Sequence, residues 1–111
     1  MVCGESDEHA RWLAAPGALA FLRLRQGRPD VYPSPEEAAE YQFTPFERQQ
    51  VEDWTKSHVV GGVATVRSRL EALVERTGVD ELMVTTMAYD HNERVASYTR
   101  LADAFALTTT L

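Results

Sequence analysis

Apolar residues recur every three or four positions through most of this chain, which is the spacing of amphipathic helices. From this pattern we predict helices over residues 7–26, 35–41, 45–58, 63–77 and 93–105. One segment breaks the pattern: Glu81–Met87 is short, apolar and rich in β-branched residues, which is typical of a buried strand.

Two shorter segments have the character of extended chain. Met1–Gly4 resembles the end of a strand, and Val59–Gly62 is an apolar pair followed by two glycines. Helices that connect parallel strands are the building units of α/β proteins. The sequence therefore predicts a helix-rich α/β fold with few parallel strands, too few to cover every apolar helix face.

Capping residues mark several helix boundaries. Ser34 and Thr44 are each followed by Pro and, at the third position, by Glu, which is a typical first turn of a helix. Pro16 lacks a backbone donor, so we expect a kink or a break in the first helix. We expect Asn92 to cap the last helix and residues 108–111 to fray.

Length, charge and cysteine content narrow the class of protein. A chain of 111 residues is at most one domain, and its net charge of −6 argues against binding to nucleic acid or an anionic membrane. We find neither a transmembrane run nor a secretory apolar segment. Cys3 is the single cysteine, so an internal disulfide is excluded and a cytoplasmic location is expected.

Several motifs occur in order along the chain. Val59–Leu70 joins a Val-Val-Gly segment to a helix, Arg76–Thr86 contains Thr-Gly-Val-Asp-Glu-Leu-Met-Val, and Tyr89–His91 follows. Cys3–Ala10 reads Cys-Gly-Glu-Ser-Asp-Glu-His-Ala, as at the end of a strand and the start of its helix. Together these motifs resemble the C-terminal end of bacterial luciferase-like flavin-dependent monooxygenases, and the resemblance covers almost the whole chain.

The resemblance implies the C-terminal portion of a (β/α)₈ TIM barrel. A complete barrel takes about 250 residues, so this chain would carry only its last part. We expect residues 1–111 to form a single partial barrel domain with three parts. These are a strand end plus helix at 1–27, inserted helices at 28–58, and a helix–strand–helix closing unit at 59–111.

The same resemblance implies an oxidoreductase that oxygenates a small organic substrate with O₂ and a reduced flavin, FMN or a related flavin. Most flavin-binding positions of the family lie on strands that this chain lacks, so we do not expect the chain alone to be catalytically competent. The alternative is a non-catalytic, stand-alone remnant that acts as an oligomerisation or interaction module. Uncovered helix faces and sheet edges would favour a homo-oligomer in either case.

Candidate cofactor- or substrate-binding residues follow the predicted strand. In barrels the carboxyl ends of strands carry the chemistry, and the residues there are Thr85, Thr86, Met87, Tyr89 and His91. The alternative is that the two threonines are ordinary strand residues and that the methionine belongs to the core. We assign no catalytic residue.

Other candidate groups have two interpretations each. Asp90 could orient His91 for acid–base chemistry, or it could cap a helix or turn. Gly61–Gly62 could bind an anion or make a tight turn. The histidines show no metal-ligand spacing, so we predict no metal site, and Cys3 is expected to be a small buried residue.

Two further groups of residues could contribute to a binding site. Arg23, Arg25 and Arg28 could bind a cofactor phosphate, or they could simply complement a helix C-terminus. Tyr32 and Tyr41 flank the inserted helices, which in barrels of the resembled family often form a flap over the pocket.

Overall fold

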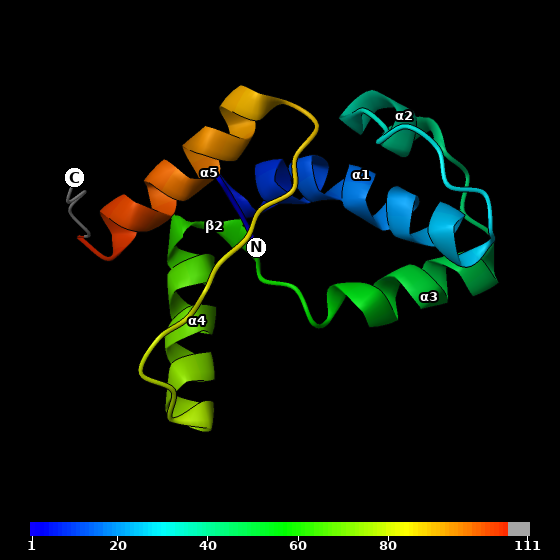
Figure 1. The fold of residues 1–111 in the computed structure, drawn as a ribbon. Coiled ribbons are helices and arrows are strands. Elements are labelled where there is room, and N and C mark those ends of the chain that lie inside the picture. The colour runs from blue at the N-terminus through cyan, green and yellow to red at the C-terminus, as the bar shows by residue number, and fades with distance from the viewer. Residues whose placement is uncertain (107–111) are drawn as a thin grey trace.

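The computed structural model describes residues 1–106, which form two strands and five helices (Figure 1). In chain order the elements are β1 (Val2–Gly4), α1 (Asp7–Arg25), α2 (Pro35–Glu40), α3 (Pro45–Thr55), β2 (Val60–Gly62), α4 (Val63–Thr77) and α5 (His91–Ala104).

The two strands pair in parallel, with Val2 opposite Val60 and Gly4 opposite Gly62. The connection between them runs through α1, α2 and α3, and both α2 and α3 pack on α1. The prediction of a helix-rich α/β fold with few parallel strands is thus confirmed. The described residues contain a sheet of only two strands, so they form no barrel by themselves.

Helices cover both faces of this small sheet. Val2 packs against Ala10 and Leu13 of α1. Its neighbour Cys3 packs on the opposite side, in a cluster with Val66 of α4 and Leu101 of α5. Because successive strand residues point to opposite faces, β1 is held between α1 on one side and the α4–α5 pair on the other.

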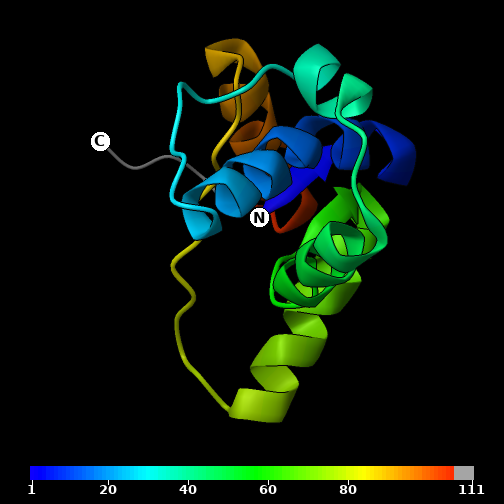
Figure 2. The same cartoon turned by 90° about the vertical axis from the view of Figure 1, so that its right-hand side faces the viewer.

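The predicted strand at Glu81–Met87 is wrong for this structure, because the segment between α4 and α5 pairs with neither β1 nor β2. It returns in an irregular path from the far end of α4 past the amino terminus (Figures 1 and 2). The Met1 ammonium group donates to the Thr85 carbonyl at 3.0 Å, and the Thr86 amide donates to the Tyr98 hydroxyl at 2.7 Å.

Glu81–Met87 does not form a strand because neither edge of β1 is free to pair with it. One edge of β1 is taken by β2, and α5 occupies the other: the Cys3 amide donates to Ser97 Oγ at 2.8 Å, and Arg100 donates to the Cys3 carbonyl at 3.0 Å. A β-branched apolar segment forms a strand only where an edge is free to pair with it. Side chains of α5 fill that place at β1.

The predicted break at Pro16 is also wrong, since α1 runs unbroken from Asp7 to Arg25. Pro16 is fully buried, as are Leu19 and Leu22 on the following turns. Burial of this apolar face outweighs the loss of one backbone hydrogen bond. The helix ends at Arg25, and Gly27 follows its C-cap Gln26 with a φ of +70°, a left-handed conformation that favours glycine.

The predicted capping residues act as expected at α2 and α3. Ser34 accepts from the Glu37 amide, and Thr44 and Glu47 form a reciprocal capping box. Helix α5, however, is capped by Asp90 rather than Asn92. The predicted fraying at 108–111 lies outside the described residues.

Within residues 1–106, no helix combines the length and the apolar character that crossing a membrane requires.

Candidate functional site

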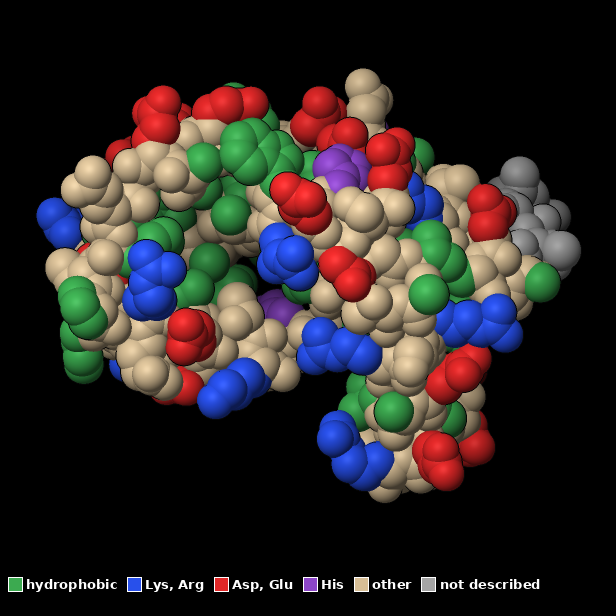
Figure 3. Space-filling model, turned by 180° about the vertical axis from the view of Figure 1, so that it is seen from behind, with side chains coloured by type: hydrophobic (Ala, Val, Ile, Leu, Met, Phe, Trp, Pro, Cys, Tyr) green, Lys and Arg blue, Asp and Glu red, His purple; other side chains and the backbone are tan. Residues whose placement is uncertain are grey.

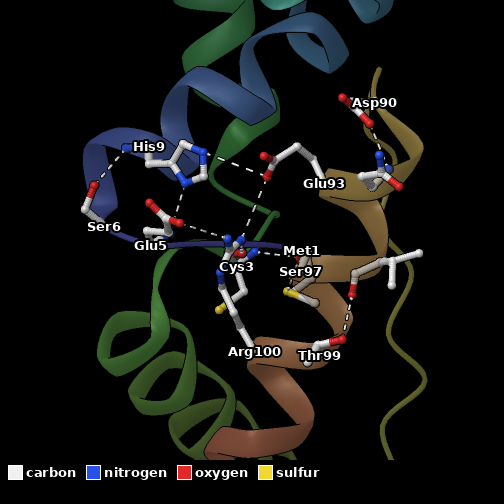
Figure 4. A network of polar contacts seen from close by, with 12 residues as sticks. Met1, Cys3, Glu5, Ser6, His9, Asp90, Glu93, Ser97, Thr99 and Arg100 are labelled. Atoms are coloured by element: carbon white, nitrogen blue, oxygen red, sulfur yellow. Dashed lines mark hydrogen bonds and ion pairs between the residues drawn. The ribbon is translucent and has the colours of Figure 1, made fainter.

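The carboxyl ends of β1 and β2 lie at one edge of the sheet, because the strands are parallel and in register. This edge is where α/β proteins place binding and catalytic groups. Four charged or ionisable side chains gather beside it, from the turn after β1 and from α1 and α5 (Figure 4). We call them the carboxyl-end cluster: Glu5, His9, Glu93 and Arg100.

The turn after β1 is tied to the end of β2 by Asp7. Its Oδ1 accepts a hydrogen bond from the Gly62 amide at 2.7 Å. This bond, with a second from the Thr65 hydroxyl, holds the pKa of the Asp7 carboxyl below its usual value. A Cβ at Gly61 would lie 2.7 Å from Thr65 Cγ2 and 2.9 Å from Asp7 Oδ1, so only glycine fits there. The glycine pair is the extended end of β2 and makes no turn, and its Gly62 amide binds the carboxylate of the chain's own Asp7.

His9 has a defined tautomer in this cluster. Its Nδ1 accepts from the Glu5 amide at 3.0 Å, so the hydrogen of the neutral ring is on Nε2. That Nε2 lies 3.9 Å from Oε2 of Glu93 on α5 (Figure 4). The first turns of α1 and α5 therefore face each other through an imidazole and a carboxylate.

Arg100 joins the cluster to β1. Its guanidinium group donates to the Cys3 carbonyl and lies 3.6 Å from a Glu5 carboxylate oxygen and 4.0 Å from Glu93 Oε2. Only 20% of the Arg100 side chain is exposed, so its contacts with the Cys3 carbonyl and Glu93 are screened less than surface ion pairs. The Glu5 side chain is 77% exposed, so solvent screens its pair with Arg100. Glu93 Oε2 is itself buried and accepts no hydrogen bond from the described residues.

The cluster can hold and move a proton. An imidazole that faces a carboxylate is the usual arrangement for general acid–base work. At 3.9 Å His9 and Glu93 are beyond direct hydrogen-bond reach, so transfer between them requires a closing movement of about 1 Å. His9 also borders an open depression of about 570 Å³ on α1, together with Arg11 and Trp12, which gives a small molecule access to the imidazole.

The structure separates the residues that the sequence predicted as one site. Thr85 and Met87 line a cavity beside Met1 and Val60, at the start of the strands. Thr86 is buried, while Tyr89 and His91 are exposed near the start of α5. Of the five, His91 comes closest in sequence to the carboxyl-end cluster, because it lies in the first turn of α5 two residues before Glu93.

Asp90 caps α5 by accepting from the Asn92 amide at 2.8 Å. Of the two interpretations of Asp90, helix capping is confirmed, because its carboxylate binds a backbone amide of the first turn of α5. Cys3 is a buried free cysteine, as expected. Burial raises the pKa of its thiol, although the nearby Arg100 partly opposes this.

The cavity that receives Thr85 and Met87 has a volume of about 400 Å³ and lies between α1, α3 and the returning segment. Seen from behind, the surface is hollowed between α1 and α3, and hydrophobic side chains are visible in the hollow (Figure 3). We call this cavity the amino-end cavity, because it touches Val2 and Val60, the first residues of β1 and β2.

Arg23 and Arg25 lie in the last turn of α1, at the end of that helix away from Ser6 and His9. Arg28 donates to Gln26 at 2.7 Å, and Arg25 lies over the Phe21 ring. These arginines therefore complement the C-terminus of α1 and do not approach the carboxyl ends of the strands.

Sequence reasoning missed His9, Glu93 and Arg100 as a group. His9 and Glu93 are 84 positions apart, and no spacing within either helix signals that the two will meet. The available signal was indirect: both residues lie in the first turn of a helix beside a strand end, where α/β folds bring such turns together. Within residues 1–106, no group of three or more His, Cys, Asp or Glu side chains is arranged so that it could hold a metal ion.

Comparison with known proteins gives a consistent picture. The chain is 30% identical over 105 residues to the uncharacterized protein YvbT of Bacillus subtilis, and 32% identical over 105 residues to YceB of the same organism. It is 29% identical over 98 residues to the luciferase-like monooxygenase of Escherichia coli K12, which covers 88% of this chain and 29% of that protein. No protein-family profile matches the chain.

Among solved structures, the crystal structure of apo-MsnO8 matches 97% of this chain and 33% of its own, with a TM-score of 0.77 and 30% identity. The resemblance to the C-terminal part of luciferase-like monooxygenases is thus confirmed, and the chain is related to that class. It spans about a third of the length of the curated relatives that it matches.

Neither the carboxyl-end cluster nor the amino-end cavity by itself fits a flavin mononucleotide. A flavin phosphate requires cations or free amides. At the carboxyl ends, Arg100 is already held by two carboxylates and a carbonyl, and the Gly62 amide is taken by Asp7. The amino-end cavity has room for a planar ring, but no Lys or Arg side chain lines it.

Proposed function

We propose that this chain forms the C-terminal third of a luciferase-like flavin-dependent monooxygenase. The observation that carries the proposal is the match to the Escherichia coli luciferase-like monooxygenase, at 29% identity over 98 residues. The structural match to apo-MsnO8, with a TM-score of 0.77 and 30% identity over nearly the whole chain, supports it. The alternative of a stand-alone interaction module has no comparable support.

In this proposal the chain supplies the last part of a (β/α)₈ barrel, with residues 1–27, 28–58 and 59–111 as its three parts. The remaining two thirds would offer the sheet edge that Glu81–Met87 lacks here. Met83 in that segment is 94% exposed, and Leu82 is 39% exposed. Pairing with a further strand would cover these apolar side chains and satisfy the unpaired backbone.

The proposed pocket residues of this chain are Thr85, Thr86, Met87, Tyr89 and His91. Tyr89 and His91 are exposed beside the first turn of α5, so they are available to a cofactor or substrate. Met87 is 70% exposed and is likewise available. Thr86 is buried in this structure, and we include it because it lies between Thr85 and Met87. We add His9 and Glu93, which can hold a proton at the edge where this fold places its chemistry.

The reaction would insert one oxygen atom of O₂ into a small organic substrate and release the other as water. Reduced FMN, or a related reduced flavin, would supply the two electrons and would bind mainly to the other two thirds of the barrel. A second copy of the chain is a further proposed partner, because Val31 and Phe46, which lie outside Glu81–Met87, are 82% and 73% exposed. A cytoplasmic location accords with the single cysteine.

A chimeric protein tests the proposal. The first two thirds of the Escherichia coli luciferase-like monooxygenase are joined to this chain, and FMN binding is followed by quenching of flavin fluorescence. We expect the chimera to bind FMN with a Kd within about tenfold of the intact parent, a difference of about 1.4 kcal/mol. This chain alone and the truncated parent should show no saturable binding at micromolar FMN.

Two single variants of the chimera provide the comparison. His91→Ala should weaken FMN binding or oxygen consumption, whereas Gln49→Ala, on the exposed side of α3, should leave both unchanged. A chimera that is folded by circular dichroism and monodisperse in gel filtration, yet does not bind FMN, would refute the proposed function.

A further inference from the structure

The amino-end cavity has the chemistry of a small-molecule site. Its volume of about 400 Å³ is within the range of ligand pockets, which are mostly apolar with a few placed polar groups. Ten of the residues that line it are apolar or glycine, and none carries a carboxylate, ammonium or guanidinium side chain. The lining residues are Met1, Val2, Ala14, Gly17, Ala20, Phe21, Leu24, Tyr32, Trp54, Thr55, His58, Val60, Thr85 and Met87.

Aromatic rings form one wall of this cavity. Phe21 of α1 stacks on Trp54 of α3, with ring centroids 5.0 Å apart and planes inclined by 17°. Trp54 also contacts the His58 ring at 4.0 Å. A row of flat rings that is already assembled favours a flat ligand, because such a ligand stacks without further ordering of side chains.

Tyr32 provides an unused hydrogen-bonding group at the cavity. Its hydroxyl oxygen is buried and has no hydrogen-bond partner among the described residues. The Tyr32 hydroxyl lies beside Gly17, since a Cβ atom at position 17 would be only 3.2 Å from the hydroxyl oxygen. Both residues line the cavity. Burial raises the pKa of the Tyr32 hydroxyl, so the group stays protonated and can donate. A buried hydroxyl without a partner is costly, and a ligand acceptor would remove that cost.

His58 provides an acceptor for the same ligand. Its Nδ1 lies 2.9 Å from the Trp54 carbonyl, which can only accept, and 3.2 Å from the Ser57 hydroxyl, which itself donates to that carbonyl. A hydrogen on Nδ1 satisfies both contacts. In the neutral ring Nε2 is then a free lone pair. Thr55, by contrast, already donates its hydroxyl hydrogen to the Glu52 carbonyl. The cavity thus combines one donor and one acceptor with apolar walls.

We propose that the amino-end cavity binds a neutral, planar aromatic molecule that carries a hydroxyl or comparable polar group. The ring stacks against Phe21 and Trp54, the polar group accepts from Tyr32, and its hydrogen is donated to His58. No Lys, Arg, Asp or Glu side chain lines the cavity, and its one cation, the Met1 ammonium group, already donates to the Thr85 carbonyl at 3.0 Å. The cavity therefore lacks the set of donors that a phosphate such as that of FMN requires. The site lies at the opposite end of the strands from the carboxyl-end cluster, but it shares Thr85 and Met87 with the proposed monooxygenase pocket. Its test therefore uses this chain alone, which should not bind FMN, so that failure of 2-naphthol binding and failure of the proposed function are distinguishable.

The test is a titration of the complete chain with 2-naphthol, a neutral aromatic alcohol. Trp54 reports binding by quenching of its fluorescence in a Trp12→Phe background, since Trp12 lies outside the cavity. We expect saturable binding with a Kd on the order of 100 µM, which is reasonable for so small a ligand. Absence of saturation up to millimolar 2-naphthol would overturn the proposal.

The Tyr32→Phe variant tests the polar contact. It removes one oxygen atom and should weaken 2-naphthol binding about fivefold, the usual worth of a neutral hydrogen bond. Naphthalene lacks the hydroxyl and should bind equally to both proteins. Tyr41→Phe is the matched control, because the Tyr41 hydroxyl donates to Glu47 outside the cavity. Equal loss of 2-naphthol binding in the two tyrosine variants would contradict the assignment.

A second variant tests the location without relying on Tyr32. Ala20→Leu places a larger side chain in the cavity and should abolish 2-naphthol binding, whereas Ala72→Leu on the exposed side of α4 should not affect it. Unchanged binding to Ala20→Leu would show that 2-naphthol binds elsewhere.

Discussion

The two ends of the small sheet differ sharply in chemistry. At the carboxyl ends of β1 and β2, charged groups from α1 and α5 contact one another and the backbone of β1. At the amino ends, the walls are aromatic and aliphatic, and no charged side chain takes part. Two strands of three residues each are therefore enough to separate a polar site from an apolar one.

The two ends also differ in how the chain assembles them. The carboxyl-end cluster joins residues from the two extremes of the described chain, such as Glu5 and Arg100. Half of the residues that line the amino-end cavity come from α1 and α3, which belong to one connection between the strands. The polar end therefore depends on the docking of α5, and the apolar end depends on α1 and α3. Substitutions can separate these two dependencies.

The largest effect is expected for Ser97→Ala at the polar end. Ser97 is 1% exposed, and its hydroxyl accepts from the Cys3 amide at 2.8 Å. The substitution leaves a buried amide without a partner, so the free energy of unfolding should fall by about 2–3 kcal/mol. Urea unfolding measures this, and Ser68→Ala on the exposed face of α4 should change it by less than about 0.5 kcal/mol.

Arg100→Met should have the next largest effect. The methionine keeps the apolar stem but removes the donor to the Cys3 carbonyl and the cation between Glu5 and Glu93. We expect a loss of about 1–2 kcal/mol in the free energy of unfolding, with faster amide exchange in α5. If the amide hydrogens of α5 exchanged as slowly in Arg100→Met as in the parent chain, the contacts of Arg100 would not hold α5 against β1.

At the apolar end, Phe21→Leu should cost about 0.5–1.5 kcal/mol, the worth of an aromatic pair beyond its buried area. The Phe21–Trp54 stack is lost, so the Trp54 fluorescence should change, while amide exchange in α5 should not. A concurrent change in α5 would mean that the two ends are coupled, contrary to the separation described above.

The smallest expected effect is a change in pH dependence. The bond from the Gly62 amide lowers the pKa of Asp7 in the folded state, so this carboxylate stabilises the fold above the unfolded value of about 3.9. The stabilisation is lost as the pH falls through the lower, folded pKa. Asp7→Asn should therefore lose less stability than the parent between pH 6 and pH 2.5 in urea titrations. Identical pH profiles would show that Asp7 does not link α1 to β2.

Much of the fold could be predicted from local signals. Ser34, Thr44 and Gly27 set helix boundaries through contacts within a few residues, and those boundaries are correct to within a few positions. The strand at Glu81–Met87 could not be predicted reliably, because its formation depends on a free sheet edge rather than on its composition. Pro16 was misleading for a similar reason. It removes one backbone hydrogen bond locally, but burial of the apolar face of α1 outweighs that loss.

The candidate site was less accessible to sequence reasoning. The rule that chemistry follows strand ends led to Thr85–His91, but the predicted strand is not formed, and these residues are divided between the two ends of the sheet. His9 and Glu93 meet only through the packing of α5 against β1. Contacts between residues so far apart in the sequence leave no periodic signal in it. The family resemblance could be found without them, because it rests on short motifs.

Amide hydrogen exchange of residues 82–87 tests the central claim most directly, namely that this chain supplies the closing part of a larger barrel. The measurement compares the isolated chain with the chimera that carries the first two thirds of the Escherichia coli luciferase-like monooxygenase. In the isolated chain these amides should exchange rapidly, because the segment pairs with no strand. In the chimera they should be protected about a hundredfold or more, as in a paired strand. Rapid exchange of these amides in a folded chimera would contradict the account.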